Sequence, residues 1–288
     1  MAYTHSIYSK TRVADLDTQR HVTSRTYEAM CYEGRHALLE SRGYSFDSML
    51  EKKQRLVPLT CYVKFINQQM PGAELRVDTI AYAEGEGVIL WQQQVFAADD
   101  RPVCEILVRT RFEEDGDPLD ILQSNPEDQE AHAALQKLLP IIAPFSGGCR
   151  RVESTLTALY SERDIFGEYS NGALWRFFED GRWFFSEKLG LTLDTFVRLD
   201  TTAFFMGAVF HYHQPLRAGQ SVYVFTWMER IEKIRGYMRQ DAYVKNERGE
   251  LELVMSSREE QLIVQLSKAR PRRAPQEYID IVGDYIEK

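Results

Sequence analysis

The chain has 288 residues and a mass of 33.5 kDa, enough for one large domain or for two of about 140 residues each. Hydrophobic residues make up 44% and charged residues 27%, which predicts a substantial core and excludes a disordered chain. The 35 Lys and Arg stand against 43 Asp and Glu, a net charge of −8, which argues against broad binding to nucleic acid or anionic membranes. The four cysteines form no CxxC pair and the first residues show no signal pattern, so we expect a soluble, cytoplasmic protein.

An internal repeat is the strongest signal of organisation. At a spacing of 147 positions, residues 17–113 align with residues 164–260 without a gap. Glycines at the expected ends of helices and turns are among the matches, and glycine is favoured there because it adopts positive φ freely. The identical pairs are Asp17/Asp164, Gly34/Gly181, Arg35/Arg182, Glu40/Glu187, Gly43/Gly190, Asp47/Asp194, Gly72/Gly219, Val77/Val224, Thr79/Thr226, Gln93/Gln240, Arg101/Arg248, Glu105/Glu252, Arg111/Arg258 and Glu113/Glu260.

Each copy predicts one helix followed by several strands. In the first copy the helix runs from about Thr26 to Ser41 and stops at Gly43, and strand-like segments separated by turn signals follow. In the second copy the helix runs from about Gly172 to Leu189, again before strands. This order predicts an α+β fold with antiparallel sheets, not alternating βαβ units.

The repeat also predicts the domain boundaries. We expect a first domain at 1–115, a crossover linker at 116–150, a second domain at 151–270 and a C-terminal tail at 271–288. Inside the linker, Asn125 and Pro126 are typical of a helix start, and the helix would run to Leu139.

Candidate chemistry gathers just before the first helix. Asp15, Asp17 and His21 precede the helix start, whose free amide groups favour negative charge. A carboxylate there can attack a carbonyl or activate water, while a backbone N–H polarises the carbonyl oxygen. These residue types also occur as ordinary helix caps, so the local pattern alone leaves a structural role open.

The pattern D-L-D-x-x-x-H-V-x-x-x-x-Y over residues 15–27 resembles the opening motif of hotdog-fold thioesterases, of the acyl-ACP and 4-hydroxybenzoyl-CoA types. The resemblance implies a double hotdog, in which each half is a long helix wrapped by a curved antiparallel sheet. It also implies Asp17 as the catalytic carboxylate, Gln19 and His21 as its neighbours, and a backbone oxyanion site near Ser24. Gln19 departs from the Asn that is usual in the motif.

A second site is predicted in the second copy. Asp164 aligns with Asp17, whereas Glu168 stands where the first copy has His21. The stretch Gly172-Ala173-Leu174 followed by Glu179 resembles phenylacetyl-CoA-type hotdog thioesterases, which implies Asp164 and Glu179 as candidates for catalysis. The alternative is that this copy has become a structural partner.

The sequence therefore predicts a thioester hydrolase acting on acyl-CoA or acyl-ACP, with Asp17 as nucleophile or general base. We expect no metal and no organic cofactor, no nucleic-acid or membrane partner, and consider a homo-oligomer of such chains. Two alternatives stay open: a hotdog dehydratase or hydratase acting on acyl thioesters, and a non-catalytic acyl-CoA binding protein.

Overall fold

The structure is a computed structural model that describes residues 3–16, 21–124 and 126–288. The chain forms two compact units, of which the first comprises Met1–Pro140 and Glu162–Leu174 and the second Ile141–Ser161 and Trp175–Lys288. The segment Glu162–Leu174 therefore belongs to the second copy of the repeat but packs within the first unit. Nowhere in the described part of the chain is a helix both long and apolar enough to cross a bilayer.

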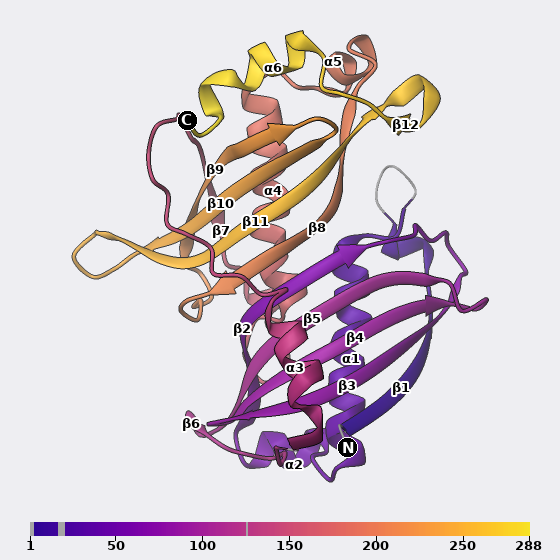
Figure 1. The fold of residues 1–288 in the computed structure, drawn as a ribbon. Helices are drawn as coiled ribbons and strands as arrows, with labels where there is room; N and C mark the ends of the chain where they lie inside the picture. The colour runs from indigo at the N-terminus through magenta and orange to yellow at the C-terminus, as the bar shows by residue number, and fades with distance from the viewer. Residues whose placement is uncertain (1–2, 17–20, 125) are drawn as a thin grey trace. The chain divides into compact units, whose positions relative to one another are not determined.

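The first unit contains one antiparallel sheet with the strand order β1-β3-β4-β5-β2 and a short β6 on β5 (Figure 1). Its helices are α1 (Ser24–Ser41), α2 (Phe46–Glu51) and α3 (Gln129–Gln136). The strands are β1 (Tyr3–Lys10), β2 (Gln54–Phe65), β3 (Glu74–Gly85), β4 (Val88–Ala97), β5 (Pro102–Glu114) and β6 (Asp117–Pro118).

The second unit repeats this sheet with the order β7-β9-β10-β11-β8 and a short β12 on β11. Its helices are α4 (Asn171–Lys188, whose first turn packs in the first unit), α5 (Leu193–Arg198) and α6 (Gln276–Val282). The strands are β7 (Val152–Thr157), β8 (Thr202–Tyr212), β9 (Ser221–Glu232), β10 (Arg235–Lys245), β11 (Leu251–Gln265) and β12 (Arg270–Pro271). The predicted α+β class with antiparallel sheets is thus confirmed.

The predicted spacing of 147 describes the repeat closely as far as the fourth main strand of each copy. Helices α1 and α4 begin and end 147 residues apart, as do α2 and α5, and β3 and β9. The expectation of an alignment without a gap is wrong beyond that point. Phe96 pairs with Pro102, whereas Tyr243 pairs with Leu253, so the hairpin of the second copy is four residues longer. The matched pairs from Arg101/Arg248 onward are therefore not structurally equivalent.

Helix α1 forms where the sequence provides both ends. Thr23 caps it, because its hydroxyl accepts a hydrogen bond from the backbone N–H of Thr26, and Gly43 follows the helix at a φ of +92°. In the middle of the helix, Gly34 allows a close approach to the sheet: a Cβ there would lie 2.7 Å from Thr79 Oγ1. The predicted helix start differs from the observed one by only two residues.

A buried glutamine ties α1 to the sheet at this contact. Gln93 Nε2 donates to the backbone oxygen of Cys31 on α1 at 2.7 Å and to Thr79 Oγ1 at 2.9 Å. The amide thereby gives a helix carbonyl a second hydrogen bond and provides a partner for a buried strand hydroxyl.

The second copy preserves the same arrangement. Gln240 Nε2 donates to the backbone oxygen of Phe178 on α4 at 2.9 Å, and Thr226 Oγ1 donates to Gln240 Oε1 at 2.9 Å. A Cβ at Gly181 would lie 2.2 Å from Gln240 Oε1. The repeated Gly, Thr and Gln thus mark one packing contact that occurs in each copy.

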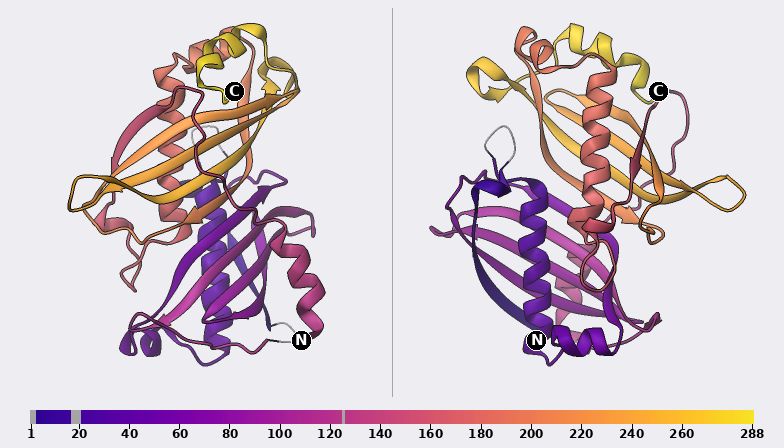
Figure 2. Two further views of the ribbon diagram at one scale, coloured as in Figure 1. Left: turned by 60° about the vertical axis from the view of Figure 1, so that its left-hand side comes forward. Right: turned by 180° about the vertical axis from the view of Figure 1, so that it is seen from behind.

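The face of each sheet that does not contact α1 or α4 is covered differently in the two units. In the first unit α3 lies on this face (Figure 1), and Leu135 of α3, followed by Leu138 and Leu139, packs with Tyr82, Leu90 and Leu107. In the second unit Phe145 from an extended segment meets Trp227 with ring centroids 4.9 Å apart. Figure 2, seen from behind, shows α1 and α4 each lying along the other face of its own sheet.

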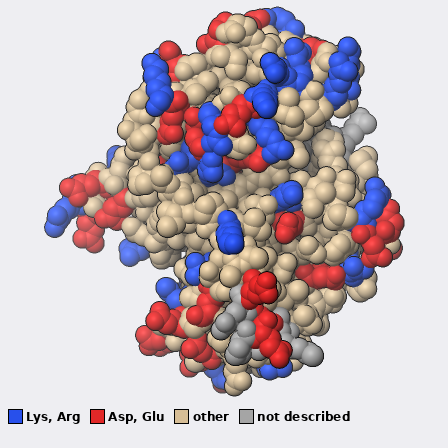
Figure 3. All heavy atoms as spheres, in the orientation of Figure 1, with Lys and Arg blue, Asp and Glu red and all other residues tan. Residues whose placement is uncertain are grey.

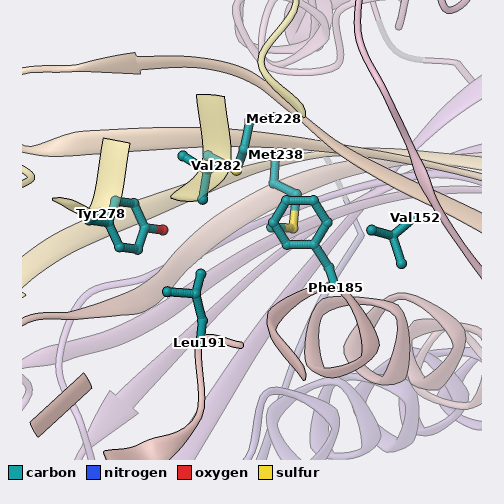
Figure 4. Packing of buried hydrophobic residues seen from close by; sticks show 7 residues of the cluster. All are labelled: Val152, Phe185, Leu191, Met228, Met238, Tyr278 and Val282. Carbon is teal, nitrogen blue, oxygen red and sulfur yellow. The ribbon is translucent and has the colours of Figure 1, made fainter. Parts of the chain in front are cut away.

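The C-terminal segment contributes to the core of the second unit. Tyr278 and Val282 from α6 are buried against Phe185, Met228 and Met238 (Figure 4). The segment that the sequence sets apart as a tail is therefore packed against this sheet and against α4.

Charged side chains of both signs alternate in the upper part of the face shown in Figure 3. Among the residues of β9 and β11, Glu229 pairs with Arg230 and Arg258, and Arg235 of β10 pairs with Glu260. In this cluster each charge has an opposite neighbour, so the cluster forms no patch of a single sign.

Candidate functional site

The first pre-helix loop, residues 12–23, leads into α1. Asp15 in this loop is buried, and its carboxylate accepts from the backbone N–H of Arg12 at 2.7 Å and from the guanidinium of Arg12 at 2.9 Å. These hydrogen bonds hold the pKa of Asp15 below its usual value. The first acid of the D-L-D motif therefore stabilises the loop. Asp17 and Gln19 lie outside the described residues.

Three features occur where the first pre-helix loop meets α1. Leu16 and Val22 form a β-bridge, which joins the two sides of the loop. Ser24 is the first residue of α1, so by helix geometry its backbone N–H has no acceptor within the helix. His21 Nδ1 lies 2.7 Å from Nε2 of Gln68. An imidazole and a helix start thus follow the predicted carboxylate within seven residues of the sequence.

The second pre-helix loop, residues 159–170, has an equivalent bridge between Arg163 and Tyr169. Asp164 Oδ1 accepts from the backbone N–H groups of Phe166 at 2.9 Å and of Glu168 at 3.0 Å. The hydroxyl of Tyr32 on α1 donates to Asp164 Oδ2 at 2.7 Å. Both oxygens of this carboxylate are thus engaged in shaping the loop and holding it on α1.

Two further contacts hold the second pre-helix loop in the first unit. Glu168 pairs with Arg55 at 2.5 Å, and burial raises the pKa of this glutamate. The ring of Phe166 stacks on His36, with centroids 5.5 Å apart and planes 9° from parallel. Burial lowers the pKa of His36 to about 4, so this imidazole is neutral near pH 7 and acts as an aromatic surface.

A pocket of about 360 Å³ lies beside this loop. Apolar and charged side chains both line it, and they include the ion pair between Lys53 and Asp115, whose charged atoms are 2.9 Å apart. The lining residues are Met49, Leu50, Lys53, Gln54, Arg55, Asp115, Gly116, Ile165 and Phe166.

A buried ion pair that the sequence analysis missed lies at the centre of the first unit. Glu28 and Arg35, both on α1, are almost fully buried and hydrogen-bonded to each other. Asn171 Nδ2 donates to Glu28 Oε1 at 3.0 Å, and Arg35 Nη1 donates to Gln93 Oε1 at 2.6 Å. The match of Arg35 with Arg182 was the available signal, but a match between surface arginines would look the same in a sequence.

The two residues predicted for the second site belong to different units. Asp164 belongs to the first unit, whereas Glu179 lies half-buried on α4 in the second unit. The aromatic residues of α4 serve mainly in packing. Trp175 stacks on Phe210 with centroids 5.0 Å apart, and Phe185 is part of the core of the second unit.

The described side chains also bear on metal binding. Within the described ranges, no group of three or more His, Cys, Asp or Glu residues is arranged to hold a metal ion.

Known proteins share both the sequence pattern and the fold. The pattern of the thioesterase-like superfamily matches residues 159–281. Among solved structures, an acyl-ACP thioesterase from Bacteroides thetaiotaomicron superposes with a TM-score of 0.61 at 14% identity, over 90% of this chain and 98% of that chain. The 12:0-ACP thioesterase from Umbellularia californica superposes with a TM-score of 0.64 at 10% identity, over 94% of this chain and 95% of that one.

A third structure, from Lactobacillus plantarum, carries a provisional assignment as an oleoyl thioesterase and superposes with a TM-score of 0.70 at 12% identity, over 95% of this chain and 98% of that one. The predicted resemblance to hotdog-fold acyl thioesterases is confirmed. The predicted enzyme class, a thioesterase, is confirmed with it. Among curated proteins, no sequence matches the chain.

Proposed function

We propose that this thioesterase hydrolyses an acyl thioester at the first pre-helix loop, with the carboxylate of Asp17 as nucleophile or general base. The observation that carries the proposal is the position of the D-L-D-x-x-x-H-V motif directly before α1. Asp15, the other acid of the motif, is engaged with Arg12, and this leaves Asp17 as the acid of the motif to which we assign the reaction.

The neighbours of Asp17 suit the other tasks of the reaction. A backbone N–H at the start of α1, at or near Ser24, would stabilise the negative charge that develops on the thioester oxygen. His21 and Gln19 would orient the attacking water or carboxylate. Neither task needs a metal or an organic cofactor.

The substrate that we propose is a fatty acyl thioester presented by CoA or by an acyl carrier protein. Two structures that share the fold over at least nine-tenths of the chain are named as acyl-ACP thioesterases, and this supports a carrier-bound substrate. The acidic net charge of −8 weighs against docking of a carrier protein that is itself acidic. Both presentations are therefore included in the test.

The proposal is tested by measuring thiol release from a panel of acyl-CoA and acyl-ACP substrates of different chain lengths. Free thiol and free acid should appear in equal amounts. Enoyl thioesters should not gain water, which would indicate a hydratase. Binding of the panel by the wild-type protein without thiol release or hydration would contradict the proposal and favour a non-catalytic binding protein.

The two roles left for Asp17 differ in one intermediate. As a nucleophile, its oxygen forms a bond to the acyl carbon as the carbon–sulfur bond breaks and the thiol leaves, which gives a mixed anhydride. As a general base, it takes a proton from water, and the acyl group never joins the protein. Rapid quenching and mass spectrometry would detect an acyl adduct on the peptide containing Asp17 only in the first case.

A further inference from the structure

Gln68 presents its side-chain amide to His21 from the loop between β2 and β3. The distance from Gln68 Nε2 to His21 Nδ1 is 2.7 Å. An amide nitrogen can only donate a hydrogen bond, so Nδ1 is the acceptor. A neutral imidazole then carries its proton on Nε2, because one ring nitrogen donates when the other accepts.

The backbone that carries Gln68 is fixed on both sides. Asn67 Nδ2 donates to the backbone oxygen of Pro102 at 2.7 Å, and Thr11 Oγ1 donates to the backbone oxygen of Met70 at 2.7 Å. The backbone N–H of Val22, next to His21, donates to the oxygen of Gln69 at 3.4 Å. The loop therefore holds Gln68 beside His21 through its own anchors.

The second copy builds the base of the same loop with the same hydrogen bonds. Gly72 donates to the oxygen of Thr11 at 2.9 Å, and the equivalent Gly219 donates to the oxygen of Ala158 at 2.7 Å. Gln68 therefore corresponds structurally to Pro215.

Both members of the pair differ in the second copy. Pro215 replaces Gln68 and has no N–H to donate, and Glu168 replaces His21. Glu168 bonds to Arg55 instead. The histidine and its amide partner have thus been retained together in one copy and are absent together from the other.

We propose that Gln68 is a positioning residue for the thioesterase reaction, which sets His21 in the tautomer that donates through Nε2–H. This rests on the proposed function of the first pre-helix loop. In that tautomer His21 offers a hydrogen-bond donor to the reacting oxygen or sulfur atom and holds no lone pair on Nε2. The proton acceptor of the reaction is then the carboxylate of Asp17 and not the imidazole.

The tautomer is tested directly by ¹⁵N NMR of histidine-labelled protein, in which the His21 signals are assigned by their loss in His21→Asn. Wild-type protein should show a proton on Nε2. Gln68→Glu replaces the donor by an acceptor and should move the proton to Nδ1, whereas Gln123→Glu, an exposed glutamine outside this loop, should not. A proton on Nδ1 in the wild-type protein would overturn the proposal whatever the activity is.

Kinetics provide the second readout. Gln68→Ala should lower kcat about threefold to tenfold, as expected for one hydrogen bond. Gln68→Glu should lower kcat by at least about tenfold because it reverses the donor. KM should stay nearly constant in both variants, and Gln123→Glu should leave kcat unchanged.

If His21→Asn impairs turnover but Gln68→Glu does not, the role of Gln68 is refuted. If Asp17→Asn and His21→Asn both turn over normally, the proposed function fails instead, and the NMR result still decides the tautomer.

Discussion

The two pre-helix loops start from the same backbone plan and differ in what their acids do. A β-bridge closes each loop, Leu16 with Val22 and Arg163 with Tyr169. In the second loop the carboxylate of Asp164 accepts three hydrogen bonds, two from backbone N–H groups of the same loop and one from the hydroxyl of Tyr32. In the first loop Asp15, two residues before Asp17, has the structural role. A duplicated fold can thus keep the same loop while moving the structural acid and leaving another position for chemistry.

The buried charges of the two copies show a similar exchange. Arg35 pairs with Glu28 on its own helix, whereas Arg182 pairs with Glu259 on β11. Both arginines occupy equivalent positions, but the acid comes from a different element in each copy. The shared Gln93 and Gln240 adapt to this change, because Gln93 accepts from the arginine and Gln240 donates to the glutamate.

The largest loss of stability is expected from breaking the ion pair between Arg35 and Glu28, because both of its side chains are buried. Arg35→Met should lower the free energy of unfolding by about 3–5 kcal/mol, because Glu28 would stay buried without its cation. Arg182→Met should cost less, since Arg182 is 18% exposed and Glu259 keeps the amide of Gln240 as a donor. Urea denaturation of both variants checks the order, and an equal or larger loss for Arg182→Met would contradict this comparison.

Gly34 and Gly181 test whether the close contact between helix and sheet stabilises both copies. Gly34→Ala places a Cβ 2.7 Å from Thr79 Oγ1, and Gly181→Ala places one 2.2 Å from Gln240 Oε1. We expect each to cost about 1–3 kcal/mol through overpacking. Gly43→Ala serves as a control of another kind, because only its φ of +92° opposes the substitution and no atom lies near the new Cβ. Thermal unfolding should show both helix variants destabilised; a neutral Gly181→Ala would mean that α4 does not need this close contact.

How much of this comparison can be predicted from the sequence depends on the kind of residue. Gly34, Gly43 and the spacing of 147 predict the helices and most strands, because turns and close contacts require particular residues. The four-residue extension of the β10–β11 hairpin escaped prediction, since chance identities such as Arg111/Arg258 favoured an alignment without a gap. The burial of Glu28 escaped it too, because only the tertiary contacts with Arg35 and Asn171 distinguish it from a surface glutamate.

The residues of the candidate site also differ in whether the sequence predicts them. The motif predicts Asp17, Gln19, His21 and Ser24 by resemblance, and they stay predictions. Gln68 had no signal, because it lies 47 positions from His21 in a loop whose path depends on the strand pairing. The structural role of Asp164 could not be separated from catalysis in the sequence, since an acid before a helix suits both.

A smaller, pH-dependent effect is expected from Glu259. Burial raises the pKa of this carboxyl above its unfolded value, so the folded protein binds the proton more tightly. Its favourable contribution is complete below the unfolded pKa and is lost as the pH rises through the folded pKa. Relative to Glu259→Gln, the wild-type protein should therefore lose stability as the pH rises above about 4.5. Denaturation curves at several pH values test this, with Glu260→Gln as the neighbouring control; a difference that grows with pH in the opposite sense would refute the assignment.

The central claim, that the reaction belongs to the first loop and not to the second, is tested most directly by thiol release from Asp17→Asn and Asp164→Asn measured side by side. Asparagine at 164 can still accept from the two backbone N–H groups, so that variant should fold and keep a kcat within about twofold of the wild type. Asp17→Asn should lower kcat by about 10²–10⁴-fold with KM nearly unchanged, because it removes the base or nucleophile. Loss of turnover in folded Asp164→Asn, with normal turnover in Asp17→Asn, would contradict the account and assign the reaction to the second loop.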